Sequence, residues 1–259
     1  MGYVSVIAQE ALTADVYSLT FESPTDLSQG FEPGQFLHFR VTDSFDFTLR
    51  RPLSLCAADV QNNQITVVYR AQGEGTKRLT RLKAGDRVDV LGPLGHGFLT
   101  HQGDKKVLLI GGGIGVPPLV ELARQFHESQ VRVVSALGFA TQAQAILLDE
   151  LSDCGSLFVA TQDGSLGQHG FVTQLLTEDF CAGIDRYYAC GPTSMLKAVQ
   201  QVMRDRNIAG YLSLEERMGC GIGICVGCVH PIARDGKVVN RKTCKEGPVF
   251  LAEEVIFDE

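Results

Sequence analysis

The run KVLLIGGGIGVPP at residues 106–118 decides the fold of the central part of this 259-residue chain. Its first part, Lys106–Ile110, is apolar without alternating polar residues, as is typical of a strand buried on both faces of a parallel sheet. The glycines that follow make a tight loop, and Pro118 stands where a helix can begin without losing a hydrogen bond. The run therefore predicts a strand, a loop and a helix of an α/β sheet.

The same alternation of strand and helix continues toward residue 212. Three further apolar runs are Val131–Leu137, Leu157–Ala160 and Tyr187–Ala189. Helical patterns lie between and after them, at Pro118–Ser129, Ala143–Leu151, Gly170–Leu176 and Thr193–Arg206. We therefore expect residues 103–212 to form a doubly wound parallel sheet with helices on both faces, which binds its ligand at the carboxyl ends of the strands.

Two turns of this domain are candidates for a nicotinamide site. The strict dinucleotide fingerprint fails in the glycine loop, because its last position is Val116. A plain tight turn and a loop that a ring or phosphate approaches are both open interpretations. In the second turn, Ala189–Pro192, Cys190 is the candidate catalytic residue, as a soft contact for the nicotinamide ring, unless it is an ordinary buried cysteine. The other assigned residues are Gly111, Gly112, Gly113, Gly115, Gly191 and Pro192.

The choice between NAD and NADP depends on the residues that follow the second predicted strand. Gly138–Gln142 contains no arginine or lysine to hold a 2′-phosphate, which favours NAD. The segments Asp163-Gly164 and His169-Gly170 form either a loop that faces the nicotinamide or an ordinary turn.

Residues 1–98 have the pattern of short β-strands and predict a six-stranded antiparallel barrel. Runs rich in β-branched and aromatic residues recur between turns, at Tyr3–Ala8, Val16–Glu22, Gln35–Val41, Leu53–Ala57, Ile65–Tyr69 and Arg87–Leu91. One helical piece, Thr76–Leu82, interrupts them.

Two arginines and a glycine-rich turn make the barrel a candidate dinucleotide site. Arg51 in RPLS (residues 51–54) can clamp a pyrophosphate through paired, charge-assisted hydrogen bonds, and Ser54 can offer its hydroxyl to a ring edge. A surface ion pair would be the plainer interpretation of Arg51 alone. Arg70 ends a later strand, and GEGT (residues 73–76) then opens the helical piece with free backbone N–H groups. Together these features suit a dinucleotide with a pyrophosphate.

The last region, residues 213–259, is rich in glycine and cysteine and is expected to need a metal centre in place of an ordinary core. Of eight cysteines, Cys220, Cys225, Cys228 and Cys244 crowd into its middle with the spacing C-x4-C-x2-C followed by a fourth. That is the plant-type [2Fe–2S] spacing. A zinc site is the alternative, but zinc ribbons present two C-x-x-C pairs. Four cysteines complete the ligand set, so the nearby His230 is expected to be a bystander.

These motifs in this order resemble the ferredoxin–NADP reductase superfamily, and within it the electron-transfer subunits of class 1B dihydroorotate dehydrogenases. The resemblance covers essentially the whole chain, and the cysteine loop followed by CKEGPVF (residues 244–250) is its most specific part. It implies FAD in the barrel, a [2Fe–2S] cluster on the four cysteines, and NAD as co-substrate. The implied FAD residues are Arg51, Pro52, Leu53, Ser54, Val68, Tyr69, Arg70, Gly75 and Thr76.

The resemblance also implies a partner and a pathway. An FMN-containing catalytic subunit would oxidise dihydroorotate, and this chain would pass the electrons through the cluster and FAD to NAD⁺ in pyrimidine biosynthesis. Two copies of each subunit would form a heterotetramer. We expect the glycine-rich cysteine loop to be the docking surface. The family's plant-type members stack a terminal aromatic residue on the flavin, and no residue here can be assigned that role.

Charge and hydropathy argue against two classes of protein, nucleic-acid binders and membrane-spanning proteins. A net charge of −7 argues against a nucleic-acid partner. No apolar run approaches the roughly 20 residues that span a membrane, and the N-terminus has no signal-peptide pattern, so a cytoplasmic location is expected. Two alternatives stay open. One is an NAD(P)H–ferredoxin or sulfide-type oxidoreductase subunit with a different partner, and the other is a redox-sensing or zinc-stabilised binding module.

Overall fold

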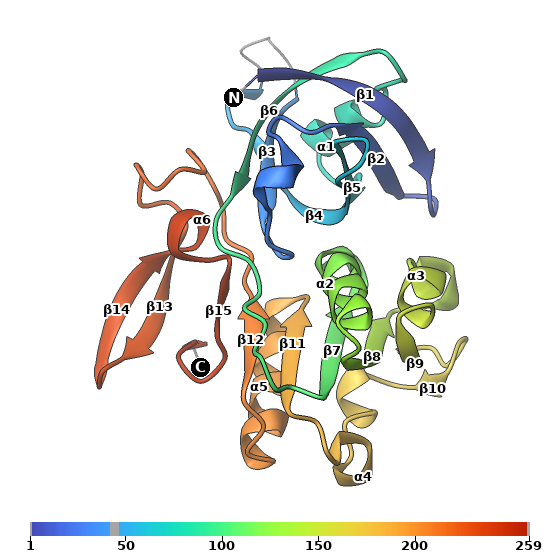
Figure 1. Ribbon diagram of the computed structural model, residues 1–259, viewed down its shortest axis with the longest axis vertical. Helices are drawn as coiled ribbons and strands as arrows, with labels where there is room; N and C mark the ends of the chain where they lie inside the picture. Colours follow the sequence, from blue (N-terminus) through green and yellow to red (C-terminus); the bar gives the residue numbers. More distant parts are fainter. Residues whose placement is uncertain (1, 42–46, 258–259) are drawn as a thin grey trace.

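The computed structural model describes residues 2–41 and 47–257. The outer ends of the predicted barrel and cysteine segment, at residues 1 and 258–259, lie outside the described residues. The chain forms a closed barrel, a seven-stranded sheet and a two-stranded C-terminal hairpin (Figure 1). None of the helices in these ranges has the length and apolar character needed to cross a membrane.

The barrel has the six antiparallel strands that the sequence predicts, in the spatial order β1-β2-β5-β4-β3-β6. Their bounds are β1 Gly2–Ala11, β2 Val16–Glu22, β3 Phe36–Arg40, β4 Arg51–Asp59, β5 Gln64–Arg70 and β6 Arg87–Leu94. A short 3₁₀ helix, η1 (Leu27–Gln29), follows β2, and α1 (Glu74–Leu79) begins two residues before its predicted start. Because side chains alternate along a strand, Leu37 and Phe39 of β3 point into the barrel core.

The seven-stranded sheet has the order β10-β9-β8-β7-β11-β12-β15, and every neighbouring pair except β12 and β15 is parallel. The strands are β7 Lys106–Gly112, β8 Arg132–Phe139, β9 Gly155–Thr161, β10 Gln168–His169, β11 Arg186–Cys190, β12 Gly210–Ser213 and β15 Val249–Leu251. The strand order reverses between β7 and β11, which makes this the switch point where doubly wound sheets bind ligands.

Helices cover both faces of this sheet and create two separate cores. They are α2 Pro117–Glu128, α3 Leu148–Ser152, α4 Glu178–Cys181 and α5 Thr193–Asp205, with the 3₁₀ helices η3 Gly113–Gly115, η4 Gln142–Gln144 and η5 Val172–Gln174. The predicted helix 143–151 is shorter because Leu147 has a left-handed φ of 58° and breaks it. The predicted helix 170–176 is wrong except for the single turn η5, since Gly170 has a φ of 123°.

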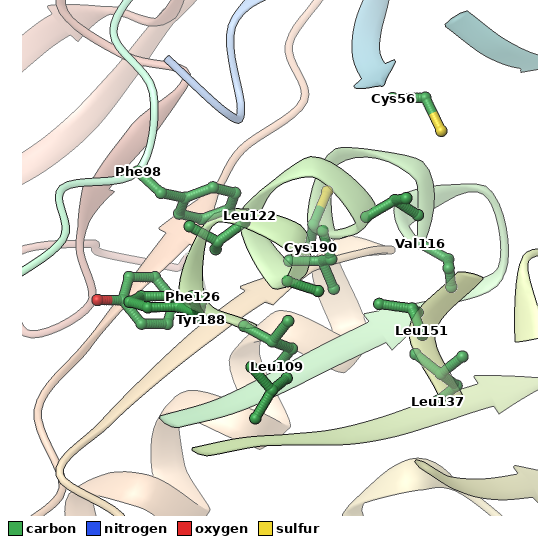
Figure 2. Close-up of a cluster of buried hydrophobic side chains, with 14 of the residues drawn as sticks. Cys56, Phe98, Leu109, Val116, Leu122, Phe126, Leu137, Leu151, Tyr188 and Cys190 are labelled. Atoms are coloured by element: carbon green, nitrogen blue, oxygen red, sulfur yellow. The ribbon is translucent and has the colours of Figure 1, made fainter. Parts of the chain in front are cut away.

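Helix α2 and the chain leaving the barrel join the two large units. Phe98 of that connection lies edge-on to Tyr188 at 5.7 Å between ring centroids. Figure 2 shows Phe98 beside Leu122, within the core that α2 forms on the sheet. From the barrel, Cys56 packs into the same core, and the Ala58 N–H donates to the buried Glu121 carboxylate at 3.2 Å. The barrel and sheet are therefore held by a shared apolar core with a polar contact at its edge.

The C-terminal segment is also built into the sheet. It contains the hairpin β13 (Val229–Arg234) and β14 (Lys237–Lys242), then α6 (Thr243–Glu246) and β15, whose Phe250 pairs with Leu212 of β12. Phe250 and Val255 pack in the core on the α5 side of the sheet. The expectation that this segment lacks an ordinary core was wrong. The core was missed because β12 and β15 are too short to show a pattern in sequence.

Truncation of Phe250 tests this anchoring. Phe250 is 6% exposed, and replacing such a phenylalanine by alanine costs about 3–5 kcal/mol. We expect Phe250→Ala to lower the free energy of unfolding by about 3 kcal/mol or more, measured by urea denaturation of the cofactor-loaded chain. Val238→Ala, at a 68% exposed position of the same segment, is the control. A loss below about 1 kcal/mol for Phe250→Ala would show that the cluster alone holds the segment.

Candidate functional site

A cavity of about 170 Å³ lies where the barrel, the sheet and the cysteine segment meet. Pro52 and Ser54 reach it from β4, and Cys190 reaches it from the end of β11. The sequence placed these residues in two separate sites, and the structure brings them to one. The complete lining is Phe36, Pro52, Ser54, Cys190, Ser213, Leu214, Glu215, Glu216, Met218 and Pro248.

Cys190 is a neutral thiol in this cavity. Its side chain is 2% exposed, and burial raises its pKa to about 12. A thiol with that pKa stays protonated at neutral pH and is not a nucleophile. The environment therefore suits the predicted role of a soft, polarizable contact and gives Cys190 no proton to transfer.

Glu215 is one of the cavity residues that sequence reasoning missed. It follows β12, which pairs with β11, so its position at the carboxyl end of the sheet appears only once β12 is known. Its side chain is open to water on one side, yet desolvation by the surrounding walls raises its pKa above the ordinary value. A carboxyl group with a raised pKa at a cofactor cavity is a candidate functional group.

Arg51 and the start of α1 form a cradle on the barrel. A methyl group added at Gly75 would come within 2.7 Å of Arg51 Nε, so the guanidinium packs directly on this glycine. Thr76 Oγ1 accepts from the Gly73 N–H at 3.2 Å and shapes the turn. A guanidinium beside a glycine-lined turn is a donor set that fits a pyrophosphate, and hence the phosphates of FAD.

The other predicted flavin residues differ in where they point. Tyr69 lies in the barrel core, and its hydroxyl donates to Gln9 at 3.2 Å. Any contact of Tyr69 with flavin must therefore use its backbone. Val68 points outward into the core shared with α2, and Arg70 forms an ion pair with Asp15 at 3.3 Å. Leu53 packs against the barrel core.

The glycine loop after β7 is explained largely by packing. A methyl group on Gly115 would lie 2.5 Å from the backbone of Cys190 and Gly191, so the loop and the second turn touch backbone to backbone. A methyl on Gly112 would collide with Met195. Gly113 alone faces open space, with a φ of 53°. Packing within the chain does not account for two of the residues predicted to contact the nicotinamide. These are Gly113 and the exposed Pro192.

The loops after β8 and β9 are tied to each other at the carboxyl edge of the sheet. The Gln142 N–H donates to Ser165 Oγ at 2.7 Å, and Ser165 Oγ donates to Asp163 Oδ1 at 2.6 Å. Hydrogen bonds from Ser165 hold the pKa of Asp163 below its usual range. Phe171, next along this edge, is 63% exposed. The loop thus presents a carboxylate and a bare aromatic ring to solvent.

The four clustered cysteines form two pairs. The Cys225 N–H donates to Cys220 Sγ at 3.4 Å, and the Cys244 N–H donates to Cys228 Sγ at 3.5 Å. A two-iron cluster needs two thiolates on each iron, which this pairing fits. Among the described residues, no group of three or more ligating side chains is close enough for a single metal ion.

Backbone hydrogen bonds favour the thiolate at Cys220. N–H groups of Cys225 and Ile222 lower the pKa of Cys220 to about 6, whereas burial raises that of Cys244 to about 12. Binding to iron removes the proton from a thiol regardless. His230 Nδ1 lies 2.9 Å from Glu216 Oε1. The side chain predicted to be a bystander thus has a carboxylate partner.

The cysteine segment rests on the barrel beside the cavity. Phe36 of β3 packs against Cys228 and Cys244, and Met218 packs on the same group. Phe36 and Met218 also line the cavity. The cluster site and the cavity therefore share a wall of two side chains.

Comparisons with known proteins agree with this arrangement. An oxidoreductase FAD-binding domain matches residues 3–98, and an oxidoreductase NAD-binding domain matches residues 109–201. The iron–sulfur cluster binding domain of dihydroorotate dehydrogenase B matches residues 215–256. Fold and site together define an NAD-linked flavin and iron–sulfur oxidoreductase.

Curated relatives narrow this class to a family. The dihydroorotate dehydrogenase B (NAD(+)) electron transfer subunit of Geobacillus thermodenitrificans (strain NG80-2) is 46% identical, over 98% of this chain and 97% of the relative. That of Shouchella clausii (strain KSM-K16) is 44% identical over 98% of each chain. The chain belongs to the family of dihydroorotate dehydrogenase B electron transfer subunits.

A solved structure supports the fold across nearly the whole chain. It is that of an NADH-dependent reduced ferredoxin-NADP oxidoreductase, with a TM-score of 0.86 and 29% sequence identity. The match covers 99% of this chain and 90% of the other.

The cradle at Arg51 makes a prediction for flavin binding. A lysine keeps the charge but loses the paired donors, so Arg51→Lys should raise the dissociation constant for FAD about tenfold or more, equivalent to about 1.4 kcal/mol. Flavin fluorescence during titration of the FAD-stripped chain measures it. Arg132→Lys, at an exposed position on β8, should bind FAD normally. Equal affinities in the two variants would remove Arg51 from the flavin site.

Proposed function

We propose that this chain takes electrons from a dihydroorotate-oxidising subunit and delivers them to NAD⁺, using a [2Fe–2S] cluster and FAD, in pyrimidine biosynthesis. The observation that supports this most directly is the wall that the cysteine segment and the cavity share. Phe36 and Met218 touch both places. An electron entering through the cysteines therefore arrives next to the residues assigned to flavin.

The division of labour between the groups follows from their chemistry. A nicotinamide moves two electrons as hydride, a [2Fe–2S] cluster moves one, and a flavin can do both. The overall reaction balances without further reagents: dihydroorotate loses two electrons and two protons, and NAD⁺ takes up two electrons and one proton. The other proton goes to water.

The chain's own residues bind and orient these groups. Cys220, Cys225, Cys228 and Cys244 would hold the cluster, and Arg51 with Gly75 would hold the pyrophosphate of FAD. Pro52 and Ser54 line the cavity from one side and Cys190 from the other. Because the buried Cys190 thiol stays neutral, it does not take part in proton transfer. Only hydride would then be exchanged beside it.

The partner is proposed to carry FMN and to pair with this chain as two copies of each subunit. The relatives' name as electron transfer subunits supports a catalytic partner. We also propose a cytoplasmic location, where the reducing environment keeps eight cysteines free of disulfides.

A related function with a different partner is favoured by one observation. The solved structure that covers most of this chain is named as an NADH-dependent reduced ferredoxin-NADP oxidoreductase. Dihydroorotate-dependent reduction of NAD⁺ by the chain co-expressed with its genomic neighbours separates the two proposals. The alternative would be favoured by two results together. NADH would bleach the flavin and iron–sulfur absorption bands, and reduced ferredoxin, but not dihydroorotate, would support the reduction of NAD⁺.

The edge loop after β9 is proposed to select NAD over NADP. Adenine can stack on the exposed ring of Phe171, and the Asp163 carboxylate is placed to accept from a ribose hydroxyl and to repel a 2′-phosphate. Both hydrogen bonds from Ser165 go to Oδ1 of Asp163, and the carboxylate is exposed to solvent.

Neutralising Asp163 should relax this selectivity. We expect Asp163→Asn to lower the ratio of kcat/KM for NADH over NADPH about tenfold, equivalent to about 1.4 kcal/mol, with ferricyanide as electron acceptor. Asp179→Asn, on the exposed start of α4, is the charge-matched control. An unchanged ratio would place the adenosine elsewhere on the sheet.

The cysteine loop is proposed as the docking surface for the partner. Ile222, Ile224 and Val226 are exposed on it, Ile224 at 78%, and such an apolar group around a redox site suits a protein interface. Gly223 is a poor probe of this surface. It has a φ of 82°, and an added side chain would press on Lys245, so the loop itself would shift.

Ile224→Glu is the sharper test. The side chain points to solvent, so the change should leave the cluster and NADH oxidation by ferricyanide intact while raising the dissociation constant for the partner at least tenfold, equivalent to about 1.4 kcal/mol. Titration calorimetry measures it. Val60→Glu, at a 47% exposed barrel position, should assemble normally. Unchanged affinity in Ile224→Glu would move the interface away from this loop.

A further inference from the structure

Strand β3 separates the barrel core from the cysteine segment. Its outward side chains are Phe36 and His38, which alternate with the inward residues. Outward side chains of a barrel usually meet solvent, but Phe36 is 2% exposed and His38 is 0% exposed. Phe36 is covered by Cys228 and Cys244. The cysteine segment therefore lies on the outer face of β3.

His38 lies against the part of this segment that carries Cys220. A methyl group added at Gly221 would collide with Nδ1 of the His38 ring, and Gly221 has a φ of 72°, so glycine is required there on both counts. Across the sheet, His38 pairs with Pro52 of β4. The imidazole thus lies against the loop that begins at Cys220, on the same face of the sheet as a residue that lines the cavity.

The imidazole ring of His38 lacks a hydrogen-bond partner in this position among the described residues. Neither nitrogen of His38 makes a hydrogen bond to any residue that the structure describes. The carbonyls of Arg50 and Cys220 lie near the ring, but outside hydrogen-bonding geometry. A buried donor without an acceptor costs about 1–3 kcal/mol, so a fully buried histidine kept in this state needs a reason.

A second unpaired group is adjacent in sequence to the last cysteine. Thr243 precedes Cys244, is 0% exposed, and its hydroxyl also lacks a partner among the described residues. One buried, unused donor group thus packs against the loop that begins at Cys220, and another belongs to the residue that precedes Cys244. Sulfur atoms of thiolates and bridging sulfides accept hydrogen bonds, and such bonds help to set the potential of an iron–sulfur cluster.

We propose that His38 is a positioning residue for the cluster, and that its ring N–H donates a hydrogen bond to a cluster sulfur on the Cys220 side. The four cysteines supply all the iron ligands, so His38 contacts sulfur and not iron. This inference rests on the proposed function, because it needs the [2Fe–2S] cluster in place. It adds a contact through which the flavin barrel itself stabilises the reduced cluster.

Two substitutions separate the hydrogen bond from the bulk of the ring. His38→Leu keeps much of the volume and removes the donor, and His38→Gln keeps an N–H. A hydrogen bond to sulfur favours the more negative, reduced cluster. We expect His38→Leu to disfavour reduction about tenfold, which lowers the midpoint potential by about 59 mV for one electron, and His38→Gln to recover most of it.

The measurement is a redox titration monitored by EPR on the cofactor-loaded complex with its partner, together with iron content and NADH oxidation by ferricyanide. Ser135→Ala removes another unpaired buried hydroxyl, in the core of β8, and should leave the potential unchanged. Full iron content with the same potential in His38→Leu would overturn the inference alone. Absence of iron from the unmodified chain would overturn the proposed function as well.

A second measurement covers the case in which His38→Leu does not assemble. Pulsed EPR of the reduced, unmodified complex with ¹⁵N-labelled histidine should show weak coupling of a histidine nitrogen to the cluster. The coupling should vanish in His38→Gln and persist in His230→Gln. No nitrogen coupling in the unmodified complex, or its loss in His230→Gln instead, would overturn the inference.

Discussion

The whole arrangement depends on one packing constraint, the covering of the outer face that β3 and β4 share. Phe36, His38, Pro52 and Ser54 all lie on this face, because Phe36 pairs with Ser54 and His38 with Pro52. A barrel strand normally gives its outer face to water, whereas this one must be covered by the rest of the chain. The cysteine segment covers the side chains of β3, and the cavity opens over those of β4, with Phe36 belonging to both. Flavin, nicotinamide and cluster residues meet because this one face of the barrel is shared by the cysteine segment and the cavity.

The sequence predicted the elements with a strong pattern and missed those defined by tertiary contacts. The six barrel strands are rich in β-branched and aromatic residues between turns, and β7, β8, β9 and β11 are continuous apolar runs, so each was found. Strands β12 and β15 are only four and three residues long, and their apolar residues make sense only when paired. Glu215 was missed for the same reason, since its place at the carboxyl edge depends on β12. His38 gave no signal at all, because an isolated histidine in a strand resembles any other.

The glycine motifs were located correctly from the sequence, but the packing role of individual glycines was not predicted. Gly115 was assigned to ligand binding, yet its lack of a side chain lets the backbone of Cys190 and Gly191 approach. These two functions are connected, because close contact of the two turns fixes Cys190 at the cavity wall. At Gly75 the space is filled by the guanidinium of Arg51. A sequence shows that glycine is present, but only the neighbours show whether a ligand or another part of the chain uses the space.

The position of β15 has a consequence for how the cluster is inserted. All four cysteines lie between β12 and β15, and these two strands are neighbours in one sheet. Once the sheet has formed, the ends of the cysteine segment are already held together, so the entropy of closing that loop is lost before iron arrives. Cluster insertion then has to order only the loop itself. An assembly factor would thus meet a chain whose final strand is already paired, with Cys220 and Cys225 partly accessible and Cys228 and Cys244 already buried beneath the loop.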